Sequence, residues 1–102
     1  MAHKVVFRRH AEKRLVDLYE YISEQASPVI AIAYIRRIRA ACLSLADFPE
    51  RGRRRDAIRP GLRTVGFEHR VTIIFRVLKT PVEIVSIAYG GRNFERELRA
   101  RK

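Results

Sequence analysis

The chain has 102 residues, of which 47% are hydrophobic, and its 22 Lys and Arg against 11 Asp and Glu give a formal net charge of +11. This composition excludes a disordered basic tail, and the length fits one domain over residues 1–102. Such a basic surface favours an acidic partner, which is a nucleic acid, an anionic membrane or an acidic protein. A single cysteine excludes an intrachain disulfide. No stretch has the length of a membrane span or the apolar core of a secretory signal, so we expect a cytoplasmic protein without a membrane partner.

The N-terminal half is predicted to form a strand and two helices. Residues 3–8 (HKVVFR) are β-branched and aromatic, which is typical of a strand. Apolar residues at helical spacing then define one stripe: Ala11, Leu15, Leu18, Ile22 and Ala26. Ser27 is predicted to cap a second helix that has Pro28 in its first turn and ends near Pro49. Its stripe is Ala31, Ile35, Ile38, Cys42 and Leu45. The short link predicts an antiparallel hairpin with one apolar side.

A connector rich in arginine follows, with the sequence FPERGRRRDAIRPGLR from Phe48 to Arg63. Its two prolines and two glycines indicate a loop. The arginines have no aromatic residues between them, unlike most surfaces that bind single-stranded nucleic acid. Charge alone could still bind a nucleic-acid duplex. The connector is otherwise a solvated loop or, in the interpretation that we favour, a docking surface for an acidic protein.

The C-terminal half is predicted to form three strands over residues 62–66, 69–78 and 82–89, joined as an antiparallel meander. In the middle strand one face is apolar (Val71, Ile73, Phe75, Val77) and the other is mixed (Arg70, Thr72, Ile74, Arg76, Leu78). The predicted fold is α+β, with the order β-α-α-β-β-β and a short C-terminal helix or tail. The hairpin covers one face of an antiparallel sheet, and the mixed face is left open to a partner.

The ordered set of these features resembles the RelE/ParE superfamily of bacterial toxins over nearly the whole chain. The matching pieces are Ala11, Asp17-Leu18 and Ile22 in the first helix, Phe48-Pro49 and Gly52 in the connector, Leu62-Arg63, and the strands HRVTIIFRV and VEIVSIAYGGR. The resemblance implies two competing activities. RelE-type members are ribosome-dependent mRNA endonucleases, whereas ParE-type members poison DNA gyrase and are not nucleases. Both kinds are neutralised by an acidic, amphipathic antitoxin.

The long helices and the FPERG connector favour a ParE-like plasmid stabilisation toxin that is not an enzyme. The sequence departs from the family at its C-terminal tract. Tyr89 stands in place of a histidine, Asn93 in place of an aspartate, and Phe94 where RelE-type members carry a tyrosine. These departures leave open a non-toxic module that binds its antitoxin and represses its own operon. In every case we expect operator DNA to be bound only through the antitoxin.

The resemblance also implies which residues form the sites. A target would be bound by the C-terminal tract and the strand residues near it: Arg63, Arg70, Arg76, Tyr89, Arg92, Asn93 and Phe94. The antitoxin would be bound by the connector and the mixed face of the sheet: Arg53, Arg54, Arg55, Ile74 and Leu78.

A nuclease would require a different use of the same residues. Arg63, Arg76 and Arg92 would stabilise the phosphate charge and Tyr89 would assist in proton transfer, although a tyrosine pKa near 10 makes a poor base. His69 is interpreted as an ordinary turn or strand residue. The histidines and the cysteine lack the spacing of metal ligands, so we expect neither a metal nor a cofactor.

Overall fold

The computed structural model describes residues 4–79 and 81–90. The predictions for Arg92, Asn93, Phe94 and a C-terminal helix or tail therefore lie outside the described residues. The elements follow the predicted order, with one short strand and one 3-10 turn added. They are β1 (Lys4–Phe7), α1 (Arg9–Gln25), α2 (Pro28–Leu43), η1 (Ser44–Ala46), β2 (Arg53–Arg54), β3 (Leu62–Phe67), β4 (Val71–Val77) and β5 (Pro81–Tyr89). In the described part of the chain, neither helix has the length and apolarity needed to cross a membrane.

The sheet has five strands in the order β1-β5-β4-β3-β2. The meander of β3, β4 and β5 is antiparallel, as predicted. However, β1 pairs with β5 in parallel, from Lys4 opposite Pro81 to Phe7 opposite Ile84. The predicted α+β fold is confirmed, and the sheet is mostly antiparallel with this one parallel edge. A parallel pair needs a long connection, and the helices and the meander provide it here.

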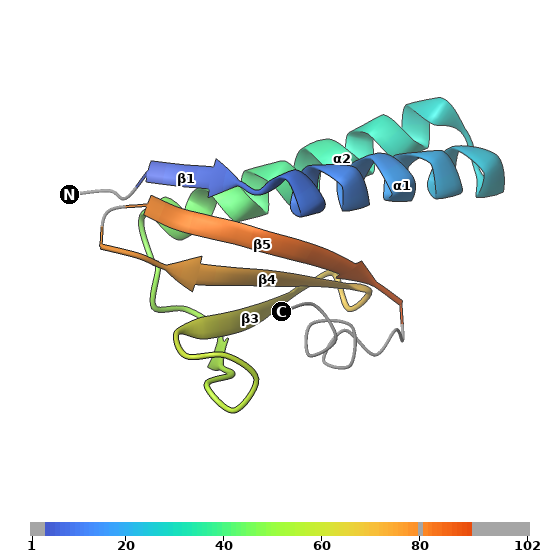
Figure 1. Cartoon of the computed structure of the whole chain (residues 1–102). Helices are drawn as coiled ribbons and strands as arrows, with labels where there is room; N and C mark the ends of the chain where they lie inside the picture. Colours follow the sequence, from blue (N-terminus) through green and yellow to red (C-terminus); the bar gives the residue numbers. More distant parts are fainter. Residues whose placement is uncertain (1–3, 80, 91–102) are drawn as a thin grey trace.

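The helical hairpin covers one face of the sheet (Figure 1). The predicted stripes are buried except for Ala26, which is exposed at the C-cap of α1. The buried residues pack with residues that β4 and β5 direct toward the helices, including Val71, Ile73, Phe75, Ile84 and Ile87. Ser27 caps α2 as predicted, because its Oγ accepts a hydrogen bond of 3.2 Å from the Ile30 N–H. The second helix ends at Leu43 and the turn η1 then buries Leu45, so the helix is slightly shorter than expected.

The outer face of the sheet carries a second apolar cluster, made of Leu62, Ile74, Val85 and Ala88. A register shift between Ile74 and Phe75 leaves Val85 of β5 without a partner in β4, and Val85 joins this cluster. Ile58 of the connector packs against it. None of the four side chains is more than 8% exposed. The expectation that this face leaves Ile74 open to a partner is therefore wrong.

Candidate functional site

The described residues of the predicted nuclease set, Arg63, Arg76 and Tyr89, lie on two different faces of the sheet, and Arg92 lies outside the described residues. Residues that are opposite each other on neighbouring strands point to the same face. Arg63 is opposite Phe75, which belongs to the core under the helices, whereas Arg76 is opposite Leu62 of the outer cluster. Arg63 therefore lies on the helix side, where its Nη1 donates a hydrogen bond of 2.9 Å to the Glu50 carbonyl.

Tyr89 also lies on the helix side, because it is opposite the core residue Val71. Its ring centroid is 5.9 Å from that of Tyr21 and 6.4 Å from that of Tyr34. Arg63 and Tyr89 are nonetheless far apart, since their partners Phe75 and Val71 are four residues apart on β4, on the order of 13 Å along the strand. Tyr89, Arg63 and Arg76 thus do not form one constellation.

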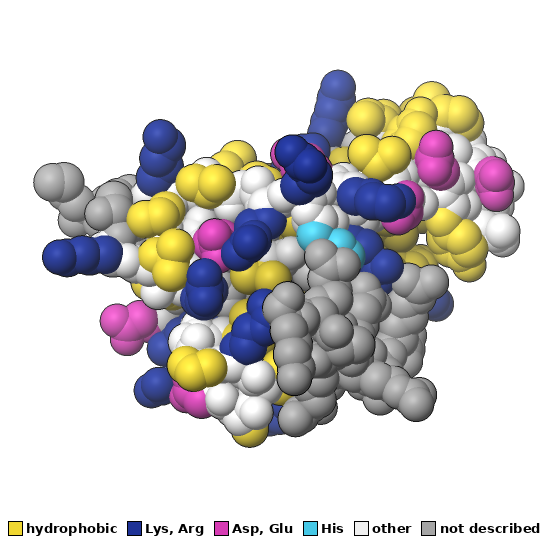
Figure 2. All heavy atoms as spheres, viewed as in Figure 1, with side chains coloured by type: hydrophobic (Ala, Val, Ile, Leu, Met, Phe, Trp, Pro, Cys, Tyr) yellow, Lys and Arg dark blue, Asp and Glu magenta, His cyan; other side chains and the backbone are white. Residues whose placement is uncertain are grey.

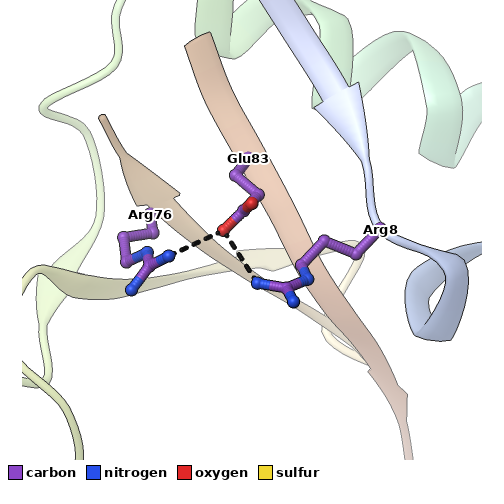
Figure 3. A network of polar contacts seen from close by, with 3 residues as sticks. All are labelled: Arg8, Arg76 and Glu83. Atoms are coloured by element: carbon purple, nitrogen blue, oxygen red, sulfur yellow. Dashed lines mark hydrogen bonds and ion pairs between the residues drawn. The ribbon is translucent and has the colours of Figure 1, made fainter. Parts of the chain in front are cut away.

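Arg76 belongs to a network on the outer side of the sheet (Figure 3). One oxygen of Glu83 accepts from Arg76 Nη2 at 3.1 Å and from Arg8 Nη1 at 3.2 Å, and the Glu83 side chain is only 17% exposed. Within the described part of the chain, the buried Nε of Arg76 has no hydrogen-bond partner. One carboxylate therefore faces two guanidinium groups, and the network keeps a net positive charge that can attract an acidic group.

A groove of about 640 Å³ opens between α1 and the end of β5, with polar and aromatic side chains around it. Its lining consists of Arg14, Asp17, Leu18, Tyr21, Arg70, Ile87, Tyr89 and Gly90. The groove brings together two predicted target-binding residues, Arg70 and Tyr89. Sequence reasoning assigned neither Tyr21 nor Arg14 to a site; Arg14 Nε donates to the Ile87 carbonyl at 3.2 Å. Arg14, Leu18 and Tyr21 are four and three residues apart, which places them on one side of α1.

The Tyr89 ring packs against an aromatic cluster that connects α2 with the β3–β4 turn. The Tyr34 ring lies 6.4 Å from both Phe67 and Tyr89, with the Arg37 guanidinium 5.1 Å from the Tyr34 centroid. Burial, followed by the neighbouring Tyr89, raises the pKa of Tyr34. Tyr34 therefore stays neutral at physiological pH and cannot serve as a base there.

The β3–β4 turn is fixed to α2 by an ion pair. Arg37 donates through Nε and Nη2 to the two carboxylate oxygens of Glu68, at 2.9 and 3.1 Å. The hydrogen bond from Arg37 lowers the pKa of Glu68. Glu68 and His69 both have positive φ angles, of 48° and 63°, so His69 lies in a turn, one of the two alternatives that the sequence left open, and the strand begins at Val71 instead of His69.

Two residues of the arginine-rich connector form a short edge strand of the sheet, and most of the connector is exposed. Arg53 is opposite Thr64 and Arg54 is opposite Arg63, which forms the short strand β2. The Arg55 N–H donates to the Leu62 carbonyl at 2.7 Å, and its Nε donates to Thr64 Oγ1 at 3.3 Å.

Asp56 organises the bend that follows this edge. Its carboxylate accepts from the Gly61 N–H at 2.9 Å and pairs with Arg54 Nε at 2.9 Å. These contacts, the Gly61 hydrogen bond first, lower the pKa of Asp56. Arg53 and Arg54 remain exposed, whereas Leu78 is half-buried and Ile74 is fully buried. The polar part of the predicted antitoxin surface is thus accessible, and most of its apolar part is not.

Other candidate chemistry finds little support in the described residues. Cys42 is fully buried in the core, and burial raises its thiol pKa to about 12, which leaves no reactive thiolate. Among residues 4–79 and 81–90, no three His, Cys, Asp or Glu side chains gather as metal ligands would.

A helical hairpin on one face of a five-stranded, mostly antiparallel sheet is the fold of the RelE/ParE class of toxins. The chain belongs to the family of ParE toxins of the type II toxin–antitoxin system parDE, whose model matches residues 5–94. This match confirms the predicted resemblance, and the chain is accordingly the toxin component of such a system.

Solved structures show the same fold. A chain of the chromosomal ParDE system from P. aeruginosa is 22% identical, with a TM-score of 0.77, over 87% of this chain and 97% of that one. A chain of the RelBE2 toxin–antitoxin complex from Mycobacterium tuberculosis is 16% identical, with a TM-score of 0.62, over 87% of this chain and 99% of that one. A mutant of the E. coli toxin RelE in the free state is 13% identical, with a TM-score of 0.66, over 99% of this chain and 97% of that one. The comparison of this sequence with curated proteins found no match.

Proposed function

We propose that this toxin acts by binding DNA gyrase and trapping it on cleaved DNA, without cleaving RNA itself. The observation that supports this proposal is the separation of Arg63 and Tyr89 from Arg76 on opposite faces of the sheet. Cleavage of RNA requires a base, an acid and cations that converge on one phosphate within hydrogen-bond reach. The described members of the predicted nuclease set, Arg63, Arg76 and Tyr89, do not converge in this way, whereas a toxin that acts by binding needs only an accessible surface.

The proposed antitoxin is an acidic, amphipathic protein segment that docks on the arginine-rich edge. Arg53 and Arg54 are exposed on β2, and the network of Arg8 and Arg76 adds positive charge on the outer face. Two of the similar structures are named as toxin–antitoxin systems or complexes, which supports a partner of this kind. Operator DNA would be bound through the antitoxin, and the toxin would act in the cytoplasm.

The direct test is an assay of purified toxin with gyrase, ATP and supercoiled plasmid. We expect linear DNA to accumulate in proportion to the toxin and supercoiling to be lost, because trapped gyrase leaves its DNA cut. Addition of the cognate antitoxin should prevent both effects. If the toxin leaves supercoiling intact and no linear DNA appears, gyrase is not the target.

A further inference from the structure

The far end of the helical hairpin differs in charge from the rest of the molecule. Residues 15–35 contain three of the 11 acidic residues and none of the 22 basic ones. Asp17 is paired with Lys13 at 3.3 Å. Glu20 and Glu24 are exposed and make no ion pair with the described residues. They are one helical turn apart, so they lie on the same side of α1.

The same end exposes large aliphatic side chains at the start of α2. Val29 is 76% exposed, Ile30 is 55% exposed and Ile32 is 40% exposed. Figure 2 shows hydrophobic and acidic side chains together at this end of the molecule, while Lys and Arg lie over the rest of it, including the other turns of the two helices. Exposed aliphatic residues that cluster in this way are typical of a contact surface. We call Glu20, Glu24, Val29, Ile30 and Ile32 the hairpin tip.

We propose that the hairpin tip binds a basic, apolar patch on the protein target of the toxin. This inference rests on the proposed function, in which the target is an enzyme that holds DNA. Such an enzyme carries an excess of Lys and Arg around its DNA path, and Glu20 and Glu24 complement those that the DNA leaves uncovered. An acidic antitoxin, by contrast, is repelled by these two carboxylates and attracted to the arginines of β2 and the connector.

The proposal gives the two ends of the molecule different partners. The hairpin tip contacts the target, and the basic edge formed by Arg53 and Arg54 contacts the antitoxin. Loss of target binding with retention of antitoxin binding is therefore the signature to look for in a variant of the tip.

The test compares two tip variants with two matched controls in the full-length toxin. Glu20→Lys/Glu24→Lys reverses the tip charge, and Val29→Ser/Ile30→Ser removes apolar surface. Asp47→Lys/Glu50→Lys makes the same charge change on exposed residues elsewhere, and Leu43→Ser replaces a side chain that is 55% exposed. Binding to immobilised gyrase without DNA, binding to the antitoxin, sedimentation and thermal unfolding are measured for each.

We expect the tip variants to bind gyrase at least about tenfold more weakly and to bind the antitoxin within about twofold of the wild type. The controls should match the wild type in gyrase binding, and all variants should unfold like the wild type. Tip variants that bind gyrase normally would overturn the inference and leave the proposed function standing. Tip variants that lose antitoxin binding to the same extent would assign the tip to the antitoxin and also overturn the inference. A wild-type toxin that sediments as a dimer, with tip variants that sediment as monomers, would assign the tip to a second copy of the toxin and overturn the inference as well. A wild type that does not bind gyrase would overturn both proposals.

Discussion

Gly52 shows how one residue determines the conformation of the connector. Its φ is +87°, and a Cβ atom there would lie 2.4 Å from the Thr64 carbonyl oxygen. Only glycine allows the chain to approach β3 this closely and then pair through Arg53 and Arg54.

We therefore expect Gly52→Ala to destabilise the toxin by about 1–3 kcal/mol, measured by urea unfolding. Gly66→Ala is the matched control, because its Cβ would meet nothing closer than the Val71 carbonyl oxygen at 4.0 Å. Equal effects of the two substitutions would contradict this explanation.

Tyr89 allows a test of the binding mechanism at the level of one hydroxyl group. Tyr89→Phe keeps the ring that packs against Tyr21 and Tyr34, so we expect toxicity within about twofold of the wild type. If the Tyr89 hydroxyl transferred a proton, Tyr89→Phe would instead reduce toxicity by about 100-fold or more. The measurement is growth arrest at matched expression, and Tyr89→Ala, which removes the ring, is the comparison that should lose activity.

The faces of individual residues were only partly predictable from the sequence. Alternation correctly placed Ile74 and Arg76 on the face of β4 away from the core residues Ile73 and Phe75. The burial of Ile74 was not predictable, because it depends on a register shift and on Ile58, far away in the chain. The face of Arg63 depends on the β3–β4 register, which is set by a turn without glycine.

At the scale of elements, the contact between Arg37 and Glu68 ties α2 to the β3–β4 turn. The pKa of Glu68 is lowered in the folded state, so the contact stabilises the fold fully above the unfolded-state pKa. That stabilisation is lost as the pH falls through the folded-state pKa.

We expect a ¹³C NMR titration of the carboxyl groups to place the Glu68 midpoint below the usual value for glutamate. Arg37→Gln should raise the midpoint, because it removes the guanidinium that causes the shift. Asp56 provides an internal control, since its pKa is lowered mainly by the Gly61 N–H and should not change. A Glu68 midpoint that Arg37→Gln leaves unchanged would contradict the assignment.

Helices were easier to predict than strand directions. The stripes from Ala11 to Ile22 and from Ala31 to Cys42 repeat with the helical period, and the structure buries both. The predicted N-cap at Ser27 is also confirmed. The parallel pairing of β1 with β5 has no local signal, because it depends on where the hairpin returns the chain.

For the whole molecule, the asymmetry of charge is the main physical feature. The basic edge around Arg53 and Arg54 should bind the antitoxin largely through electrostatic attraction. We expect affinity for the antitoxin to fall on the order of tenfold between about 0.1 and 1 M salt, measured by calorimetry. Arg53→Gln should make this dependence shallower, and an affinity indifferent to salt would contradict the role of the edge.

The central claim is that this toxin stops growth as a binding protein and not as a nuclease. Primer extension on messenger RNA from cells arrested by the toxin tests it most directly, with a known ribosome-dependent nuclease as the positive control. Growth arrest with messages that keep the ends seen before induction is the predicted result. New 5′ ends within translated messages, which disappear in Arg76→Ala or Tyr89→Phe, would contradict it.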